Sequence, residues 1–149
     1  MIEAVGIESA ALLADLHARA FEKAWREAEF AEILNNQATF ALVARAGAPQ
    51  GFVLGWTAAG DAEVLTVAVI PEARRKGIGA SLVTAAGVAA LVRGAAHMHL
   101  EVAEDNIAAR ALYIKLGYEE AGRRHAYYAG EGGAVDAVIM RRALPRPIV

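Results

Sequence analysis

The stretch from Glu63 to Val92 constrains the fold more than any other part of the sequence. Glu63–Ile70 is an almost wholly apolar run rich in β-branched residues, which is typical of a central strand buried on both faces. Pro71 ends this strand, and a basic, glycine-containing segment then leads into a helix with apolar residues at helical spacing up to position 92. The next strand is predicted over 97–103. Because a strand–helix–strand unit runs parallel, we expect one parallel pair in the sheet.

The other elements surround this unit. We predict strands at 1–5, 39–45, 50–57, 118–124 and 134–144, and helices after Ser9 and over 26–34 and 106–116, with a glycine-rich turn at 130–133. The apolar stripe of the first helix is expected to include Phe21, and His17 is expected to be a satisfied histidine on a face of that helix. The resulting order, β-α-α-β-β-β-α-β-α-β-β, predicts an α/β sandwich with one mixed, mainly antiparallel sheet of about seven strands and about four flanking helices. No repeat or linker divides the 149 residues, so we expect one domain over 1–149.

Composition excludes several classes of function. The chain has no cysteine, and therefore no disulfide, thiolate nucleophile or cysteine-based zinc site. Its net charge of −2 argues against nucleic-acid binding through a broad basic surface. The longest uncharged stretch, 77–92, is shorter than the ~20 residues of a membrane span, and the first residues lack a signal-peptide pattern. We expect a cytoplasmic monomer or homodimer with no metal site and no nucleic-acid or membrane partner.

The helix entry at Arg74-Arg75-Lys76-Gly77-Ile78-Gly79 has the features of an anion-binding site. A helix N-terminus presents unpaired N–H groups, and glycine lets an anion approach the backbone closely. A pyrophosphate-containing ligand is one interpretation, and a plain glycine-rich helix entry with solvated basic residues is the other. The dinucleotide-binding fingerprint does not fit, because Leu82 stands at the third glycine position and six residues, 71–76, separate the strand from Gly77.

Two further residues are candidates for chemistry. Glu101 lies between Leu100 and Val102, so alternation places its carboxylate on the opposite face of an otherwise apolar strand. It could be a general base or a partner in an ordinary salt bridge to an arginine. On the following helix, Asn106 and Tyr113 share one face, and Tyr113 could be either a packing residue or a group that reaches a cleft.

The combined pattern closely resembles the GNAT superfamily of CoA-dependent N-acyltransferases, and within it the RimI branch of ribosomal-protein-alanine N-acetyltransferases. The likeness spans nearly the whole chain. The residues that carry it are Leu65–Val69, Arg74-x-x-Gly77-x-Gly79, Leu100-Glu101-Val102, Asn106, Ala111-Leu112-Tyr113, Gly117-Tyr118, Arg123-Arg124-x-x-Tyr127-Tyr128 and Asp136-Ala137-x-x-Met140.

The resemblance implies a function and a set of site residues. Acetyl-CoA would lie between the strands at 65–69 and 98–103 and would give its acetyl group directly to an amine. Glu101 would be the general base and Tyr113 the general acid. The cofactor contacts implied are Val67, Ala68, Val69, Arg74, Arg75, Lys76, Gly77, Ile78, Gly79, Ala80 and Asn106.

The acceptor implied by the RimI branch is the α-amine at a protein N-terminus, with a ribosomal protein as the example. Trp25, Tyr127 and Tyr128 are expected to shape its entrance, or else to be half-buried packing residues. Alternatives are a small-molecule amine, a lysine side chain, or a non-catalytic CoA-binding module. The chain departs from the usual family pattern at Ala24, Ala103 and Tyr118, where proline, arginine and phenylalanine are common.

Overall fold

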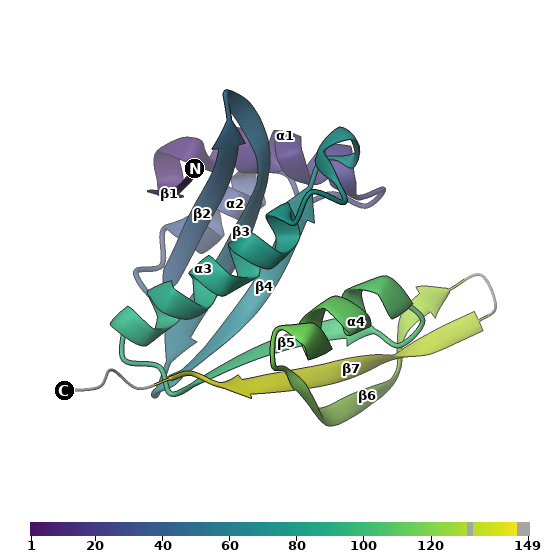
Figure 1. The fold of residues 1–149 in the computed structure, drawn as a ribbon. Helices are drawn as coiled ribbons and strands as arrows, with labels where there is room; N and C mark the ends of the chain where they lie inside the picture. Colours follow the sequence, from purple (N-terminus) through teal and green to yellow (C-terminus); the bar gives the residue numbers. More distant parts are fainter. Residues whose placement is uncertain (131–132, 146–149) are drawn as a thin grey trace.

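A computed structural model describes residues 1–130 and 133–145. The helices and strands follow the predicted order (Figure 1). They are β1 (Ile2–Val5), α1 (Ala10–Ala20), α2 (Glu27–Leu34), β2 (Thr39–Ala46), β3 (Ala48–Ala58), β4 (Asp61–Val69), α3 (Ile78–Val92), β5 (His97–Ala103), α4 (Ile107–Lys115), β6 (Glu119–Gly130) and β7 (Gly133–Ala143), with short 3₁₀ turns at Ile7–Ser9 and Pro71–Ala73.

The strands form one seven-stranded sheet in the order β1-β2-β3-β4-β5-β7-β6. The pair β4 and β5 is parallel and the other neighbours are antiparallel, as the strand–helix–strand unit predicts. Helices α1 and α2 cover one face of the β1–β4 half, and α3 crosses the other face (Figure 1). Helix α4 lies over the half formed by β5, β7 and β6 (Figure 1). The predicted fold class is therefore confirmed.

Two apolar clusters hold the helices to the sheet. On the α3 side, Leu82, Met98 and Leu100 are at most 2% exposed, and on the α1 side Leu13 and Phe30 are fully buried. Burying such a side chain stabilises the folded state by roughly 1.5–3 kcal/mol. Side chains alternate in direction along β5, and its even-numbered residues face the core and belong to the first cluster.

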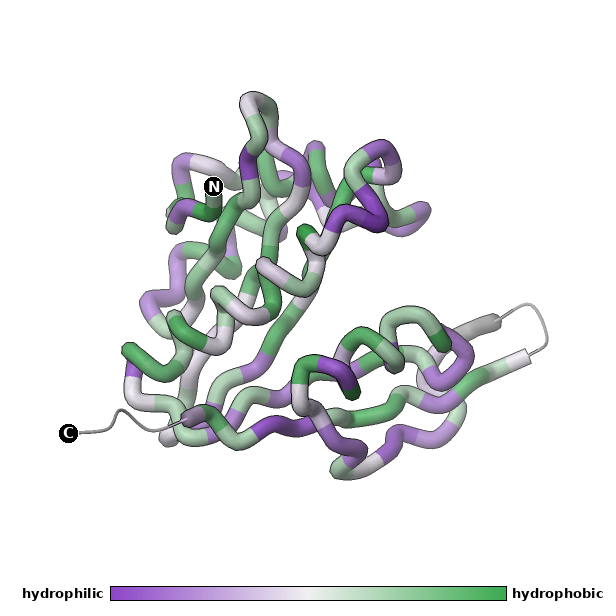
Figure 2. The backbone as a smooth tube through the Cα atoms, in the orientation of Figure 1, coloured by the Kyte–Doolittle hydropathy of each residue, from purple (hydrophilic) through white to green (hydrophobic). Residues whose placement is uncertain are grey.

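Small residues let α3 lie close to the sheet. Ala86, Gly87 and Ala90 form part of its buried face, while Val88 and Val92 are exposed on the outer face. Figure 2 shows this helix as largely apolar, whereas the loop before it is hydrophilic. The N-terminus of α3 is thus fixed by packing, and the charged loop at 72–76 is left at the molecular surface.

Local details differ from the sequence prediction in three places. Ser9 occupies the N-cap position of α1, but its side chain makes no capping hydrogen bond, because residues 7–9 already form a 3₁₀ turn. Phe21, predicted on the apolar stripe of α1, falls just beyond the helix and is 43% exposed. Strand β6 extends six residues past the predicted end at Arg124, to Gly130, with irregular pairing after Arg124. The predicted turn at 130–133 lies partly outside the described residues.

Candidate active site

Strands β4 and β5 are paired over a short distance and then separate. The three parallel pairs run from Asp61–His97 to Glu63–His99, and the rest of each strand has no partner across the divide. Figure 1 shows the two halves of the sheet diverging beyond this point. We call the space between residues 64–69 of β4 and 100–103 of β5 the β4–β5 groove. It contains one cavity, and a second cavity at the N-terminus of α3 adjoins it, with Asn106 and Ala109 in the lining of both.

The free edge of β4 presents backbone groups to this groove. The Ile70 N–H donates to Gln50 on β3. Because backbone groups alternate in direction along a strand, the N–H and C=O groups of Ala68 also point to β3, and those of Val67 and Val69 point to the open side. Val69 O accepts a hydrogen bond from Arg74 Nε at 3.1 Å, which agrees with this direction. Of the three predicted contacts on β4, Val67 and Val69 line the groove, whereas the Ala68 side chain is buried on the α1 side.

The larger cavity, of about 660 Å³, lies at the N-terminus of α3 and is called here the α3 cavity. Its lining includes Arg74, Arg75, Gly77, Ile78, Gly79, Ala80 and Asn106 from the predicted set. Arg75 and Gly77 both adopt positive φ, 64° and 77°, which curls the loop so that its N–H groups can face a common ligand. Together with the helix N-terminus, this loop is suited to a phosphate group.

The three basic residues of the loop do not act together. Arg75 lines the α3 cavity, but Lys76 lines a separate recess between α1 and the β2–β3 turn. Arg74 borders the cavity while its guanidinium donates to Val69 O at 3.1 Å and to Ala20 O at 3.4 Å. Arg74 therefore braces the loop against β4 and α1, a role that the sequence pattern did not indicate.

Asn106 occupies the junction of the two cavities. Its Oδ1 accepts the backbone N–H of Ala109 at 3.2 Å and so caps α4. Because the cap uses the oxygen, the Nδ2 amide is the part of this side chain that remains for a ligand.

The smaller cavity, of about 270 Å³, contains Glu101 and is called the Glu101 cavity. Tyr113 and Tyr128 from the predicted set line it, together with Phe21 and Thr66. The predicted acid and base thus line the same small cavity. Thr66 could have been noticed as a polar residue on an apolar strand.

Glu101 is held by an ion pair. Its Oε1 lies 2.8 Å from Nε of Arg124, and its side chain is 19% exposed. The salt-bridge interpretation of this carboxylate is therefore correct for the free protein, and a carboxylate at a cavity wall is still suitably placed to accept a proton. Arg123 turns the other way along β6 and pairs with Glu104 and Glu120, both at 2.6 Å.

Tyr113 is 8% exposed and packs edge-on against Tyr118, with ring centroids 6.0 Å apart. Burial raises the pKa of Tyr113 above its ordinary value. The phenol consequently keeps its proton at neutral pH and can donate it. The neighbouring Tyr118 hydroxyl is buried, with no hydrogen-bond partner among the described residues.

The predicted aromatic residues take different positions. Tyr128 borders the Glu101 cavity, and its pKa is raised first by burial and then by the charge of Glu101. Tyr127 is 54% exposed and lies under the Arg124 guanidinium, 5.1 Å from its ring centroid. A bulge in β6 presents both tyrosines, and it is pinned by the Ala126 N–H donating to Asp136 at 2.9 Å. Trp25 does not line the cavity but stacks on His17.

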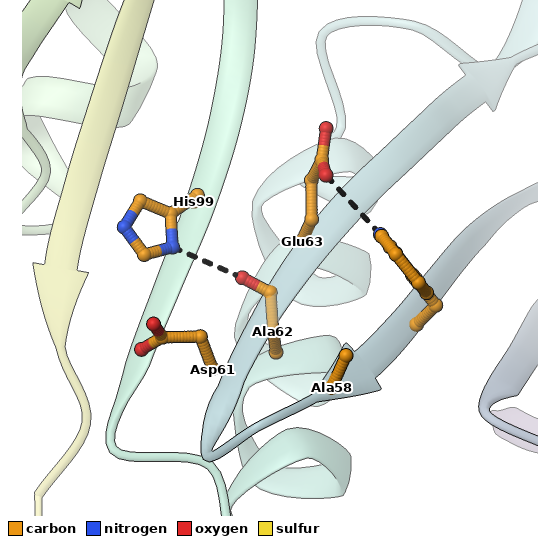
Figure 3. A pocket seen from close by; sticks show the side chains of 6 residues that line it. Ala58, Asp61, Ala62, Glu63 and His99 are labelled. Atoms are coloured by element: carbon orange, nitrogen blue, oxygen red, sulfur yellow. Dashed lines mark hydrogen bonds between the residues drawn. The ribbon is translucent and has the colours of Figure 1, made fainter.

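A further, smaller pocket of about 130 Å³ lies where β4 and β5 are still paired (Figure 3). Glu63 and His99 project from adjacent strands, and both are already bonded: Glu63 to the Trp56 indole at 3.1 Å and His99 to Ala62 O at 3.3 Å. Over residues 1–130 and 133–145, no three acidic or histidine side chains are grouped to hold a metal ion. In the same residues, no helix is long and apolar enough to span a membrane.

Comparison with known proteins agrees with this geometry. The model of the acetyltransferase (GNAT) family matches residues 10–118. The ribosomal protein bS18-alanine N-acetyltransferase of Escherichia coli strain K12 is 34% identical over 127 residues, 85% of this chain and 84% of the relative.

Solved structures agree as well. The crystal structure of the ribosomal-protein-S18-alanine N-acetyltransferase from Escherichia coli superposes with a TM-score of 0.90 at 28% identity, covering 99% of this chain and 96% of that one. Arabidopsis thaliana NAA60 in complex with acetyl-CoA shares the fold, with a TM-score of 0.80 at 16% identity over 97% of this chain and 98% of that one. The chain therefore belongs to the acetyltransferase (GNAT) family of acetyl-CoA-dependent N-acyltransferases.

Proposed function

We propose that this protein transfers the acetyl group of acetyl-CoA to the N-terminal α-amine of a protein, with an N-terminal alanine as the preferred acceptor. The observation that carries the proposal is the β4–β5 groove, which joins an anion-binding helix entry to a cavity holding both a carboxylate and a protonated phenol. The relatives named for acetylating the alanine of a ribosomal protein support the choice of acceptor.

The loop at Arg75–Ala80 would hold the pyrophosphate of acetyl-CoA, and the free edge of β4 would hold its pantetheine arm. Val67 and Val69 present amide and carbonyl groups to the groove, and an amide-bearing chain can pair with them as an added strand does. Asn106, at the junction of the cavities, would fix the point where the arm passes from one to the other. The thioester then falls in the Glu101 cavity.

Glu101 would remove the first proton. An α-ammonium group has a pKa of about 8, so much of it is not nucleophilic at neutral pH. Once deprotonated, the amine nitrogen attacks the thioester carbonyl carbon, and an N–C bond forms. Backbone N–H groups at the open edge of β4 would stabilise the developing oxyanion.

Tyr113 would complete the reaction. As the C–S bond breaks, its phenol gives a proton to the departing thiolate, and the amide nitrogen loses its remaining extra proton. The products are the N-acetylated acceptor and CoA, with one net proton released to solvent for each ammonium consumed. A phenol has an ordinary pKa of about 10, so Tyr113 carries the proton at neutral pH that this role requires.

The acceptor side is open enough for a peptide. Arg124, paired with Glu101, and Tyr127, packed against Tyr128, lie next to the Glu101 cavity and are 53% and 54% exposed, so a chain extending beyond the reacting amine could leave the cavity here. A small-molecule acceptor would favour an enclosed cavity. This exposure is the reason that we prefer a protein N-terminus to a small amine.

Two peptides test the proposal. One has a free N-terminal alanine and no lysine, and the other has a blocked N-terminus and one lysine. Each is incubated with acetyl-CoA and the protein and analysed by mass spectrometry. We expect one acetyl group on the first peptide only. Acetylation of the lysine peptide alone would overturn the acceptor while leaving the family chemistry intact.

A further inference from the structure

His17 is a buried titratable residue that the proposed reaction does not use. It lies on α1 and is 4% exposed. Its ring is enclosed by aromatic groups, with the centroids of Phe21, Trp25 and Phe30 at 4.5, 5.1 and 5.5 Å. A polar ring kept in such a place needs its hydrogen bonds satisfied.

Both ring nitrogens of His17 have partners. Nδ1 accepts the backbone N–H of Trp25 at 3.0 Å, which requires an unprotonated Nδ1 and places the ring proton on Nε2. Nε2 lies 3.4 Å from Oγ1 of Thr66, at the long end of hydrogen-bond range. Burial also lowers the pKa of His17, which favours this neutral form.

The two bonds connect the chain segment that follows α1 to strand β4. Trp25 lies in the segment at 21–26, which has no regular secondary structure, and Thr66 lies on β4. Phe21, from the same segment, and Thr66 both line the Glu101 cavity. One imidazole ring thus holds an irregular segment against the strand that carries the groove.

We propose that His17 is a positioning residue for the acceptor: its neutral ring fixes the wall formed by residues 21–26 at the distance from β4 that the acceptor chain requires. This inference rests on the proposed acceptor site in the Glu101 cavity. The hydrogen bonds of His17 go to Trp25 and Thr66, neither of which is assigned to acetyl-CoA, so we expect its effect on the acceptor and not on the cofactor.

Packing alone predicts a different outcome from this polar connection. Phenylalanine at position 17 would fill the aromatic enclosure, but it would leave the Trp25 N–H without an acceptor. Asparagine is smaller, yet its Oδ1 stands close to the position of Nδ1 and can accept the same N–H. If His17 acts by shape, His17→Phe is the milder change, and if it acts by hydrogen bonding, His17→Asn is.

The kinetic test measures KM for the acceptor peptide and for acetyl-CoA separately. For His17→Phe we expect the peptide KM to rise about tenfold, the scale for leaving a buried donor unpaired, with the acetyl-CoA KM within about twofold of wild type. His17→Asn should recover most of the loss. Leu13→Val, a packing change on the same helix, is the control and should leave the ratio of the two KM values unchanged. An unchanged peptide KM in His17→Phe, or a worse one in His17→Asn, would overturn the inference.

A second measurement needs no acceptor. Nitrogen NMR of the wild-type ring at neutral pH should show His17 with its proton on Nε2, and hydrogen exchange of the Trp25 amide should be faster in His17→Phe than in His17→Asn. A proton on Nδ1, or equal exchange in the two variants, would contradict the connection itself. If the enzyme prefers another amine as acceptor, the NMR and hydrogen-exchange results keep their meaning, and the kinetic comparison is repeated with that amine.

Discussion

Nε of Arg124 lies 2.8 Å from Oε1 of Glu101 in the free protein. A positively charged α-ammonium brought to Glu101 would meet this guanidinium as a second cation for the same carboxylate. The two cations compete for one carboxylate, and the half-exposed Arg124, resting on the Tyr127 ring, is the one able to move. Acceptor binding and release of Arg124 are expected to be linked.

Arg124→Gln should lower the peptide KM. Exposed ion pairs contribute about 0.2–1 kcal/mol, so we expect a decrease of about twofold to fivefold with little change in kcat. Steady-state kinetics at saturating acetyl-CoA measures this effect. The matched control is Arg123→Gln, because Arg123 pairs with Glu104 and Glu120 and not with Glu101. A higher peptide KM in Arg124→Gln would mean that Arg124 binds the acceptor instead.

Glu101→Gln should remove the proton acceptor while preserving the shape of the side chain. We expect kcat to fall by about 10²–10⁴-fold, the range for general-base catalysis, with the acetyl-CoA Kd nearly unchanged. Single-turnover rates and calorimetric titration with acetyl-CoA give the two quantities. Glu63→Gln is the control, since Glu63 lies on β4 outside the Glu101 cavity. Wild-type turnover in Glu101→Gln would rule out the assigned role.

Tyr113→Phe should slow expulsion of the thiolate. The substitution removes only the hydroxyl, and the buried ring keeps its packing. We therefore expect kcat to fall by at least about tenfold while acetyl-CoA still binds. With a thioester whose leaving group is better than CoA, the fall in kcat of Tyr113→Phe should be smaller. This comparison distinguishes loss of proton donation from simple damage to the cavity.

Tyr118→Phe is the matched control for Tyr113→Phe and carries an expectation of its own. The Tyr118 hydroxyl is buried without a partner among the described residues, and burial raises the pKa of Tyr118 to about 12. Removing an unpaired buried hydroxyl should increase the free energy of unfolding by about 1 kcal/mol. Urea denaturation measures this gain, and a clear loss of stability would show that the hydroxyl has a partner in solution.

The fold could be predicted well from the sequence because the hydrophobic periodicity agrees with the prolines and glycines that end or begin each element. Pro71 ends β4, Gly77 and Gly79 begin α3, and the apolar alternation of β5 places Leu100 and Val102 in the core. The same local signals located Glu101, Tyr113 and Asn106, which do meet in one groove.

Other parts of the site depend on contacts between distant segments, which local patterns do not encode. The separation of Lys76 from Arg75 follows from the direction in which the loop turns, and the Glu101–Arg124 pair follows from the register of β6 against β7. Phe21 was predicted inside α1, but the chain leaves the helix at that residue and carries the ring to the cavity. His17 looked like a satisfied histidine on a helix face, and its link to Thr66 appears only once β4 is in place.

The stability of the protein should depend on His17 below neutral pH. Burial lowers the folded-state pKa of His17 below 6.5, and the charge of Glu29 opposes this in part. The resulting stabilisation is fully present above the unfolded-state pKa and is lost as pH falls through the lower folded-state pKa.

The free energy of unfolding of wild type should therefore decrease more between about pH 7.5 and pH 5.5 than that of His17→Asn, which has no group titrating at that position. All other titratable groups are common to the two proteins and affect both alike. Equal pH dependence would show that His17 titrates normally in the folded state.

The measurement that tests the central claim most directly is the affinity of a bisubstrate compound, in which the sulfur of CoA is joined through an acetyl bridge to the N-terminal nitrogen of an alanine peptide. If the α3 cavity and the Glu101 cavity form one continuous site for cofactor and acceptor, this compound should bind at least about 10²-fold more tightly than CoA or the peptide alone. A conjugate of equal length that is joined through a lysine side chain should show a much smaller increase in affinity over CoA or its peptide alone. Equal affinity of the alanine conjugate and CoA would contradict the proposal that the acceptor amine reaches the thioester in the Glu101 cavity.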